Sequence, residues 1–216
     1  MVYLPPHFAE ADPAAMHGLI RAFPLGILIT SYTTGLTANH IPFVLDTRTG
    51  EHGRLLGHVA RNNPVWHDHD ADGEALVVFQ AAEAYISPNW YPSKLEAGEV
   101  VPTWNYAVVH VSGPLIVHDD PKWVRGQTGM LTGQQEASQS RPWKMADAPQ
   151  AYTAGMLANI VGIEIAIARL VGKTKASQDR RDDDRDGAIA GLRATGNPAH
   201  ATMAGIMDAA RQRTRT

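Results

Sequence analysis

The chain has no cysteine among its 216 residues. This absence excludes disulfide frameworks, cysteine-ligated zinc, iron–sulfur clusters and thiol nucleophiles. A chain of this length can bury about 70% of the surface that its unfolded state exposes, so it needs neither a disulfide nor a metal to fold. We expect a cytoplasmic protein, since the lack of cysteine is compatible with a reducing compartment.

Long apolar runs are also missing. No uninterrupted apolar stretch approaches the length of about 18 residues that a membrane helix requires, so we expect no membrane association. The first thirty residues contain Pro5, Pro6, His7, Glu10 and Asp12, a composition that does not fit a secretory signal.

An excess of positive charge is absent as well. The formal net charge of −3 argues against a generally basic nucleic-acid binder. The charges are unevenly distributed, because residues 1–168 carry 9 Lys and Arg against 16 Asp and Glu, whereas residues 169–216 carry 10 against 6. The basic C-terminal segment is therefore the candidate for any contact with DNA.

The usual catalytic motifs are lacking, and the histidines do not replace them. We find no serine nucleophile elbow, no phosphate-binding Walker loop and no dinucleotide-binding glycine pattern. His67 and His69 are two positions apart and would point to different faces of a helix. His40, His58 and His110 fall in predicted strands and could converge in a barrel that binds haem or a metal. Their spacing does not require this, and we predict no metal site.

Hydrophobic periodicity predicts short strands with helices around them. Strands are expected over 25–31, 36–45, 54–60, 75–80, 83–87, 104–117 and 161–171, with a turn at 33–35. Helices are expected over 13–23, 65–72, 121–135, 149–159, 184–195 and 198–213. Strands at hairpin spacing favour an antiparallel barrel, so the predicted fold class is mainly β with peripheral helices (α+β). We assign residues 1–172 to the barrel and 173–216 to a basic helical extension of the same domain.

Three polar clusters suggest a ligand site. The first is the strand segment 37–43, Thr-Ala-Asn-His-Ile-Pro-Phe. The second is 57–64, Gly-His-Val-Ala-Arg-Asn-Asn-Pro, in which a strand delivers an arginine and two amides to the start of a helix. Such groups suit a phosphate. The third, 173–178, places two lysines with hydroxyl and amide groups after a strand.

Aromatic residues are concentrated in the middle of the chain. Five of the eleven Trp and Tyr residues lie between positions 85 and 106. Their rings could cover a flat heteroaromatic ligand or fill a subunit interface. The sequence leaves both interpretations open.

Taken in order, these strings resemble the PaiB-type family of FMN-binding negative transcriptional regulators. The matching segments are 3–8 (YLPPHF), 40–43 (HIPF), 57–64 (GHVARNNP), 85–91 (YISPNWY), 101–106 (VPTWNY) and 175–178 (KASQ). The resemblance spans nearly the whole chain. It implies an FMN-binding split β-barrel related to the pyridoxamine-phosphate-oxidase-like flavoproteins, assembled as a homodimer with FMN at the subunit interface.

The resemblance also implies the cofactor-binding residues. The segment from Asn39 through His40 and Ile41 to Pro42 would line the isoalloxazine ring. Arg61, Asn62 and Asn63 would hold the FMN phosphate, helped by His58, and Val59 and Ala60 of the same segment would also contact the cofactor. Trp104 and Asn105 would close the site, and Lys175, Ser177 and Gln178 would reach it from the C-terminal segment of either subunit. The family pattern has Asn after Ser-Gln, whereas this chain has Asp179. A carboxylate beside a phosphate is unfavourable, so either Asp179 points away or this segment does not contact the phosphate.

Two functions follow from the resemblance. The first is an FMN-binding homodimer that acts as a negative transcriptional regulator, with DNA bound through the basic segment. The alternative is an FMN-dependent oxidoreductase that acts on an unidentified small molecule.

Overall fold

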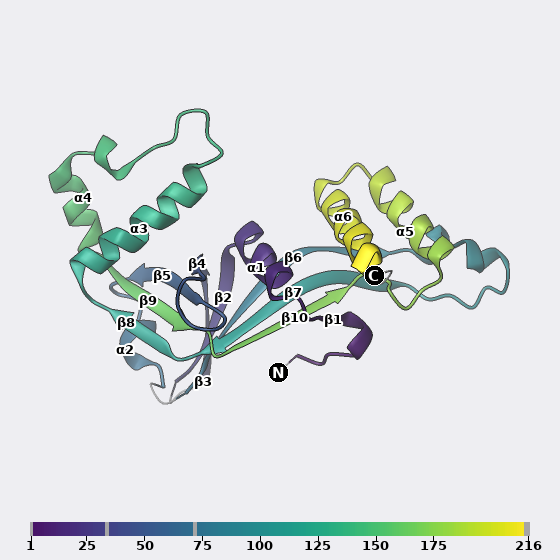
Figure 1. Cartoon of the computed structure of the whole chain (residues 1–216), viewed down its shortest axis with the longest axis horizontal. Coiled ribbons are helices and arrows are strands. Elements are labelled where there is room, and N and C mark those ends of the chain that lie inside the picture. Colours follow the sequence, from purple (N-terminus) through teal and green to yellow (C-terminus); the bar gives the residue numbers. More distant parts are fainter. Residues whose placement is uncertain (1, 33–34, 71–72, 214–216) are drawn as a thin grey trace. The chain divides into compact units, whose positions relative to one another are not determined.

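The structure, a computed structural model, describes residues 2–32, 35–70 and 73–213 (Figure 1). The predicted turn at 33–35 falls partly outside this range. In chain order the strands are β1 (Ala9–Glu10), β2 (Leu25–Tyr32), β3 (Gly35–Pro42), β4 (Val44–Asp46), β5 (Arg54–Ala60), β6 (Ala75–Ile86), β7 (Thr103–Gly113), β8 (Leu115–His118), β9 (Ile160–Ala166) and β10 (Arg169–Lys175).

The helices lie between the strands and at the C-terminal end. The α-helices are α1 (Pro13–Ala22), α2 (Val65–Asp68), α3 (Pro121–Glu136), α4 (Gln150–Leu157), α5 (Asp182–Ala194) and α6 (Pro198–Arg213). Short 3₁₀ helices are η1 (Pro6–Phe8), η2 (Pro88–Trp90), η3 (Pro92–Leu95) and η4 (Met145–Asp147). Among the described residues, none of these helices has the length and apolar character needed to cross a membrane.

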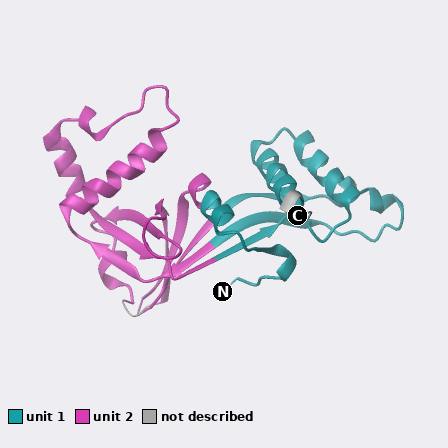
Figure 2. Cartoon of the chain, in the orientation of Figure 1, with its two compact units in different colours: residues 1–19, 80–109, 171–216 teal, residues 20–79, 110–170 magenta. Residues whose placement is uncertain are grey.

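The strands form two antiparallel sheets, and the chain forms two compact units. One sheet has the strand order β1-β10-β7-β6-β2-β3, and the other has the order β4-β5-β9-β8. Unit 1 comprises residues 1–19, 80–109 and 171–216, and unit 2 comprises residues 20–79 and 110–170 (Figure 2). The four-stranded sheet belongs to unit 2, whereas β6, β7 and β10 each run from one unit into the other.

Three of the predicted strands are wrong in length, because each is divided where the chain changes sheet. The predicted strand 36–45 is β3 and β4, 104–117 is β7 and β8, and 161–171 is β9 and the start of β10. The division between β7 and β8 falls at Pro114, which has no N–H for a ladder hydrogen bond. Conversely, the two strands predicted over 75–80 and 83–87 are the single strand β6.

A row of ionisable side chains crosses the four-stranded sheet. Asp46 on β4 accepts hydrogen bonds from Arg54 on β5, Arg54 reaches Glu164 on β9 at 3.2 Å, and the His118 ring on β8 lies 3.1 Å from the same carboxylate. Arg48 also donates to Asp46 and holds the pKa of that carboxyl well below its usual range. Each strand of this sheet thus contributes one member of the row.

Helix α3 packs on this sheet through a glycine. Trp123 of α3 stacks on the ring of His118, with centroids 4.0 Å apart. A Cβ atom at Gly162 would lie 2.3 Å from the Trp123 ring, so only glycine admits the ring here. This contact seats α3 on β8 and β9, and the apolar core of unit 2 lies beneath, with Phe43 and Phe79 in edge-to-face contact.

Unit 1 has its own core under the two C-terminal helices. The buried residues of this core are Ala84, Ile86, Tyr91, Ala176, Ala188, Ile189, Leu192, Met203, Ala204, Met207 and Ala210. Asp184 fixes the start of α5, because its buried carboxylate accepts hydrogen bonds from the backbone N–H and the hydroxyl of Ser93. The C-terminal segment is therefore packed on the 80–109 region.

Candidate functional site

Two of the predicted ligand segments meet in unit 2. Asn39 lies on β3 opposite Leu28 of β2, and its side-chain oxygen accepts a hydrogen bond from the Asn63 amide at 2.8 Å. The Asn63 oxygen in turn accepts the backbone N–H of Val65 at the start of α2. The amide nitrogen of Asn39 is buried and has no hydrogen-bond partner among the described residues. It is therefore a donor that a ligand oxygen would satisfy.

The rest of the β3 segment alternates between the two faces of its strand. Ile41 is buried in the core, whereas His40 and Pro42 are exposed. Because β3 is the last strand of its sheet, these exposed residues lie on a terminal strand. The position fits the predicted approach of a flat ring, and that role remains a prediction.

His58 and Val59, neighbours on β5, contact other parts of unit 2. Val59 is buried, and the His58 Nδ1 atom lies 2.8 Å from the side-chain oxygen of Gln127 on α3. Gln127 is itself buried and donates to the Leu56 carbonyl at 3.4 Å. The His58 ring thus joins β5 to α3, and its help in holding the phosphate stays a prediction.

Arg61 extends from the end of β5 and is held on several sides. Its guanidinium donates to both carboxylate oxygens of Asp119, at 2.9 and 2.6 Å. It also donates to the carbonyls of Ala158 and Ile160. The pair lowers the pKa of Asp119 and raises the pKa of Arg61. The arginine predicted to bind phosphate is therefore oriented in advance, but it shares its charge with a carboxylate.

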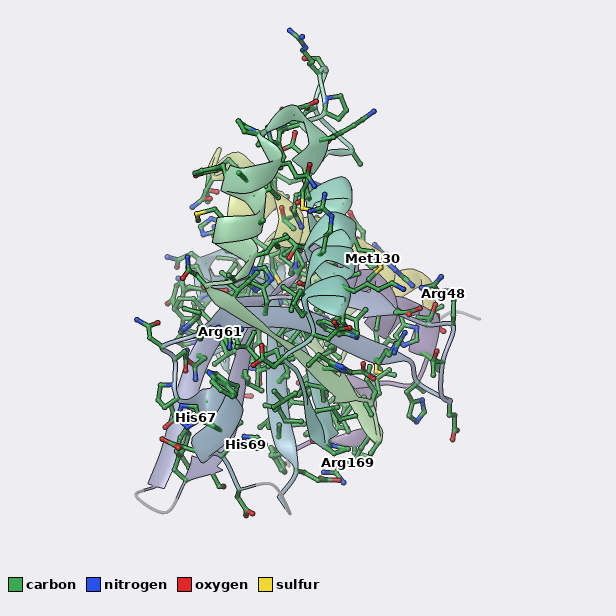
Figure 3. All side chains as sticks on the ribbon, turned by 90° about the vertical axis from the view of Figure 1, so that its left-hand side faces the viewer. Arg48, Arg61, His67, His69, Met130 and Arg169 are labelled. Carbon is green, nitrogen blue, oxygen red and sulfur yellow. The ribbon has the colours of Figure 1, made fainter. Side chains whose placement is uncertain are left out.

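A cavity opens at this point of the chain. It has a volume of about 560 Å³ and is lined by Ala60, Arg61, Asn62 and Asn159. Asn62 is exposed, and the polar side chains that line the cavity are an arginine and two amides. Figure 3 shows Arg61 on a different side of unit 2 from Arg48. The donor groups of this cavity are those that bind phosphate oxygens.

The other predicted site residues lie in unit 1 and are mostly buried. Asn105 is fully buried, and its amide donates to the Ser177 hydroxyl at 2.9 Å and lies 3.4 Å from the sulfur of Met207. Ser177 has a positive φ of 60°. Neither side chain reaches an open surface of the unit, because α6 covers them. The side-chain oxygen of Asn105 is buried and has no hydrogen-bond partner among the described residues, and the ligand contacts predicted for Asn105 and Ser177 stay predictions.

The remaining residues of this group differ in exposure. The Gln178 side chain donates a hydrogen bond to the Thr174 carbonyl and accepts one from the backbone N–H of Ala176. Lys175 donates to the Thr103 hydroxyl. Trp104, in contrast, is 55% exposed and packs edge-on against Tyr85, with ring centroids 6.1 Å apart. It is the residue of this set that offers a free aromatic surface.

Asp119 and Gln127, the partners of Arg61 and His58, were not predicted from the sequence. Neither belongs to a recognisable motif, and both lie about 60 to 70 positions away in the chain from the residues they bind. No group of three or more His, Asp or Glu side chains in the described part of the chain could hold a metal ion. The proposed convergence of His40, His58 and His110 on a metal has no support from the structure.

Comparison with known proteins shows to which family the chain belongs. Residues 2–169 match the family model described as "Putative FMN-binding domain". The chain belongs to this FMN-binding family. A protein of Emericella nidulans, AN0679, is 36% identical and aligns over 95% of this chain and 96% of its own length. The Bacillus subtilis protein named protease synthase and sporulation protein PAI 2 is 28% identical over 96% of this chain and 97% of its own.

Solved structures confirm the fold of this FMN-binding domain. The flavocytochrome Anf3 of Azotobacter vinelandii matches with a TM-score of 0.56 and 11% identity, covering 83% of this chain and 75% of the other. A Mycobacterium smegmatis protein described as binding FAD and haem matches with a TM-score of 0.54 and 17% identity, over 88% and 80%. The predicted split-barrel, α+β fold is confirmed, and so is the resemblance to the PaiB-type family.

The residues of the FMN-binding domain fit its cofactor, FMN. The buried, unpartnered Asn39 amide and the Arg61 and Asn62 donors at the cavity can satisfy the oxygens that FMN carries. When bound, the flavin supplies electron- and hydride-transfer chemistry. Through donors of this kind the chain would bind and orient the flavin.

Proposed function

We propose that this protein is a homodimeric FMN-dependent oxidoreductase that acts on a small molecule. Arg61, Asn62 and Asn63 hold the FMN phosphate, and the segment from Asn39 to Pro42 lies along the isoalloxazine ring. The observation that carries the flavin-binding part of this proposal is the Asn39–Asn63 hydrogen bond. It uses the side-chain oxygen of Asn39, whose buried amide nitrogen has no partner among the described residues and lies near the strand end that bears Arg61. A buried donor without a partner costs about 1–3 kcal/mol, and a ligand oxygen would remove that cost.

Exposed apolar residues support the homodimer. Leu25 on β2 and Leu36 on the terminal strand β3 are 59% and 77% exposed. Trp104 and Tyr85 present a second apolar area in unit 1. Aromatic and aliphatic side chains of this kind are typical of subunit contacts. Sedimentation of the purified protein tests this directly, with a mass of twice 23.4 kDa expected.

A negative transcriptional regulator is the second candidate, and the basic C-terminal segment is the feature that favours it. Its arginines, however, are largely paired within unit 1. Arg181 binds Glu96 and Asp183, Arg193 binds Asp208, and Arg211 binds Asp186. Cations that are already paired release fewer counterions on binding DNA. We therefore place the oxidoreductase first.

Two measurements on the same preparation separate the candidates. The protein is loaded with FMN and treated with NADH or NADPH without oxygen, and bleaching of the flavin absorbance is followed. In parallel, fluorescence anisotropy measures binding to a labelled duplex DNA at low and at moderate salt. The oxidoreductase predicts fast bleaching and little DNA binding. DNA binding that weakens steeply with salt, together with no bleaching beyond the rate of free FMN, would favour the regulator.

A further inference from the structure

Unit 2 contains a cavity that none of the flavin-binding residues lines. It has a volume of about 320 Å³ and lies between α3, the 3₁₀ helix η4 and α4. Its lining is mainly apolar and includes Trp143, Met145, Tyr152, Met156 and Leu157. The lining residues that the structure describes are all uncharged. FMN carries a phosphate, which no group of this lining could neutralise, so the cavity is unsuited to the cofactor.

Two of the four hydroxyl groups of the lining are used inside their own helices. Thr128 donates to the Val124 carbonyl at 2.8 Å, and Thr153 donates to the Pro149 carbonyl at 3.3 Å. An occupant of the cavity therefore meets apolar surface and few polar groups. A charged occupant would lose its hydration without compensation.

Large apolar side chains around the cavity are exposed. Trp143 is 46% exposed, Tyr152 is 62% exposed and Met156 is 53% exposed. Clustered exposure of this kind usually marks a binding surface. Aromatic rings offer rigid apolar contact, and methionine adapts its shape to different ligands.

The wall that carries Trp143 is fixed by hydrogen bonds. The backbone N–H of Trp143 donates to the carboxylate of Glu136 at the end of α3, at 2.9 Å. Lys144 and Asp147 bind each other reciprocally across η4, each at 2.9 Å. The loop after α3 is thereby tied back to the helix, so the cavity has a defined shape without a ligand.

We propose that this cavity binds a neutral, ring-containing apolar small molecule. Its volume lies at the lower end of the range of about 300–1,000 Å³ that is typical of small-molecule sites. Three segments surround the space, so the site is concave and suits a compact ligand. The absence of charge among the lining residues selects against carboxylates, phosphates and amines. The proposal is independent of the flavin site, which uses other residues.

The test uses N-phenyl-1-naphthylamine, a neutral aromatic probe whose fluorescence rises in apolar surroundings. The full-length protein, with and without FMN, is titrated with the probe. We expect saturable binding of one probe per chain and energy transfer from Trp143. Met156→Lys places a charge at the cavity and should weaken binding about ten-fold or more. Trp143→Phe should reduce the energy transfer while binding persists.

Met130→Lys is the matched control, since Met130 is an exposed methionine on α3 that does not line the cavity (Figure 3). It should leave probe binding unchanged. The proposal fails if the wild type shows no saturable binding or if both lysine variants weaken binding equally. It also fails if Met156→Lys halves the mass measured by sedimentation, because the surface would then be a subunit contact.

Discussion

Arg61 is the residue that tests the flavin site most directly. We expect Arg61→Ala to weaken FMN binding about 10- to 100-fold, the effect of losing a charge-assisted hydrogen bond to the phosphate. Riboflavin has no phosphate, so its affinity should change little. Flavin fluorescence quenching, measured with both ligands on wild type and variant, provides the comparison.

The comparison needs a control for the structural role of Arg61. The side chain also binds Asp119 and the carbonyls of Ala158 and Ile160, so its loss could disturb the end of β5. In that case riboflavin and FMN would weaken together, and the phosphate assignment would be wrong. Arg48→Ala removes another exposed arginine of unit 2 that pairs with a carboxylate, and it should affect neither ligand.

Asp46 gives a prediction about stability and pH. Asp46→Asn deprives Arg48 and Arg54 of their carboxylate and should lower the free energy of unfolding by about 2–4 kcal/mol at pH 7. The pKa of Asp46 is depressed in the folded state, so its stabilisation is complete above the unfolded pKa of about 3.9 and is lost as pH falls below it. The difference between wild type and variant should therefore shrink in acid.

Urea denaturation at pH 7, 4 and 3 measures this difference. Glu51→Gln serves as the control, because Glu51 is exposed and has no ion pair in the described part of the chain. A penalty for Asp46→Asn that stays constant from pH 7 to pH 3 would show that the depressed pKa makes no contribution to stability.

At the level of single elements, α3 carries glycines that have no packing role. A Cβ atom at Gly126 would meet nothing within 4 Å, and the residue is exposed in the helix. Gly126→Ala should therefore stabilise the protein by about 0.5–1 kcal/mol. Gly113→Ala is the contrasting substitution, because its Cβ would lie 1.8 Å from the Ala166 carbonyl oxygen and should destabilise by about 3 kcal/mol or more. Thermal unfolding followed by circular dichroism compares the melting temperatures of the two variants. Equal shifts in melting temperature would contradict the different packing of the two glycines.

The elements also show how far periodicity predicts the fold. Helices α3, α5 and α6 and strand β5 were predicted within about two residues, because their caps and alternation are local signals. The divisions between β7 and β8 and between β9 and β10 were missed, since a strand that changes sheet keeps its apolar pattern on both sides of the corner. The apparent gap in β6 arises because its buried positions change from odd to even residues near Ala82, which looks like a break although the strand continues.

The candidate site was predictable only in part, for a related reason. Residues next to each other in sequence, such as Arg61 to Asn63, could be proposed together as phosphate ligands from a motif, and that assignment stays a prediction. Partners distant in sequence could not, so the pairing of Arg61 with Asp119 became visible only in the fold. The burial of Asn105 under α6 was also beyond sequence reasoning, because it depends on where the C-terminal helices pack.

At the scale of the whole molecule, the two units share strands rather than a flexible linker. β6, β7 and β10 each begin in one unit and end in the other. Unfolding either unit would fray strands that the other needs, so we expect one cooperative transition. Leu55→Ala in unit 2 and Leu192→Ala in unit 1 remove fully buried side chains and should each destabilise by about 2–5 kcal/mol.

Fluorotryptophan labelling can follow the two units separately, since Trp90 lies in unit 1 and Trp123 in unit 2. Their fluorine signals should lose intensity at the same urea concentration, and either leucine variant should move both midpoints together. Measurements at one fixed protein concentration, without FMN, keep ligand and subunit effects constant. If Leu192→Ala moved the Trp90 transition alone, the shared strands would not couple the units, and unit 1 would unfold as an independent domain.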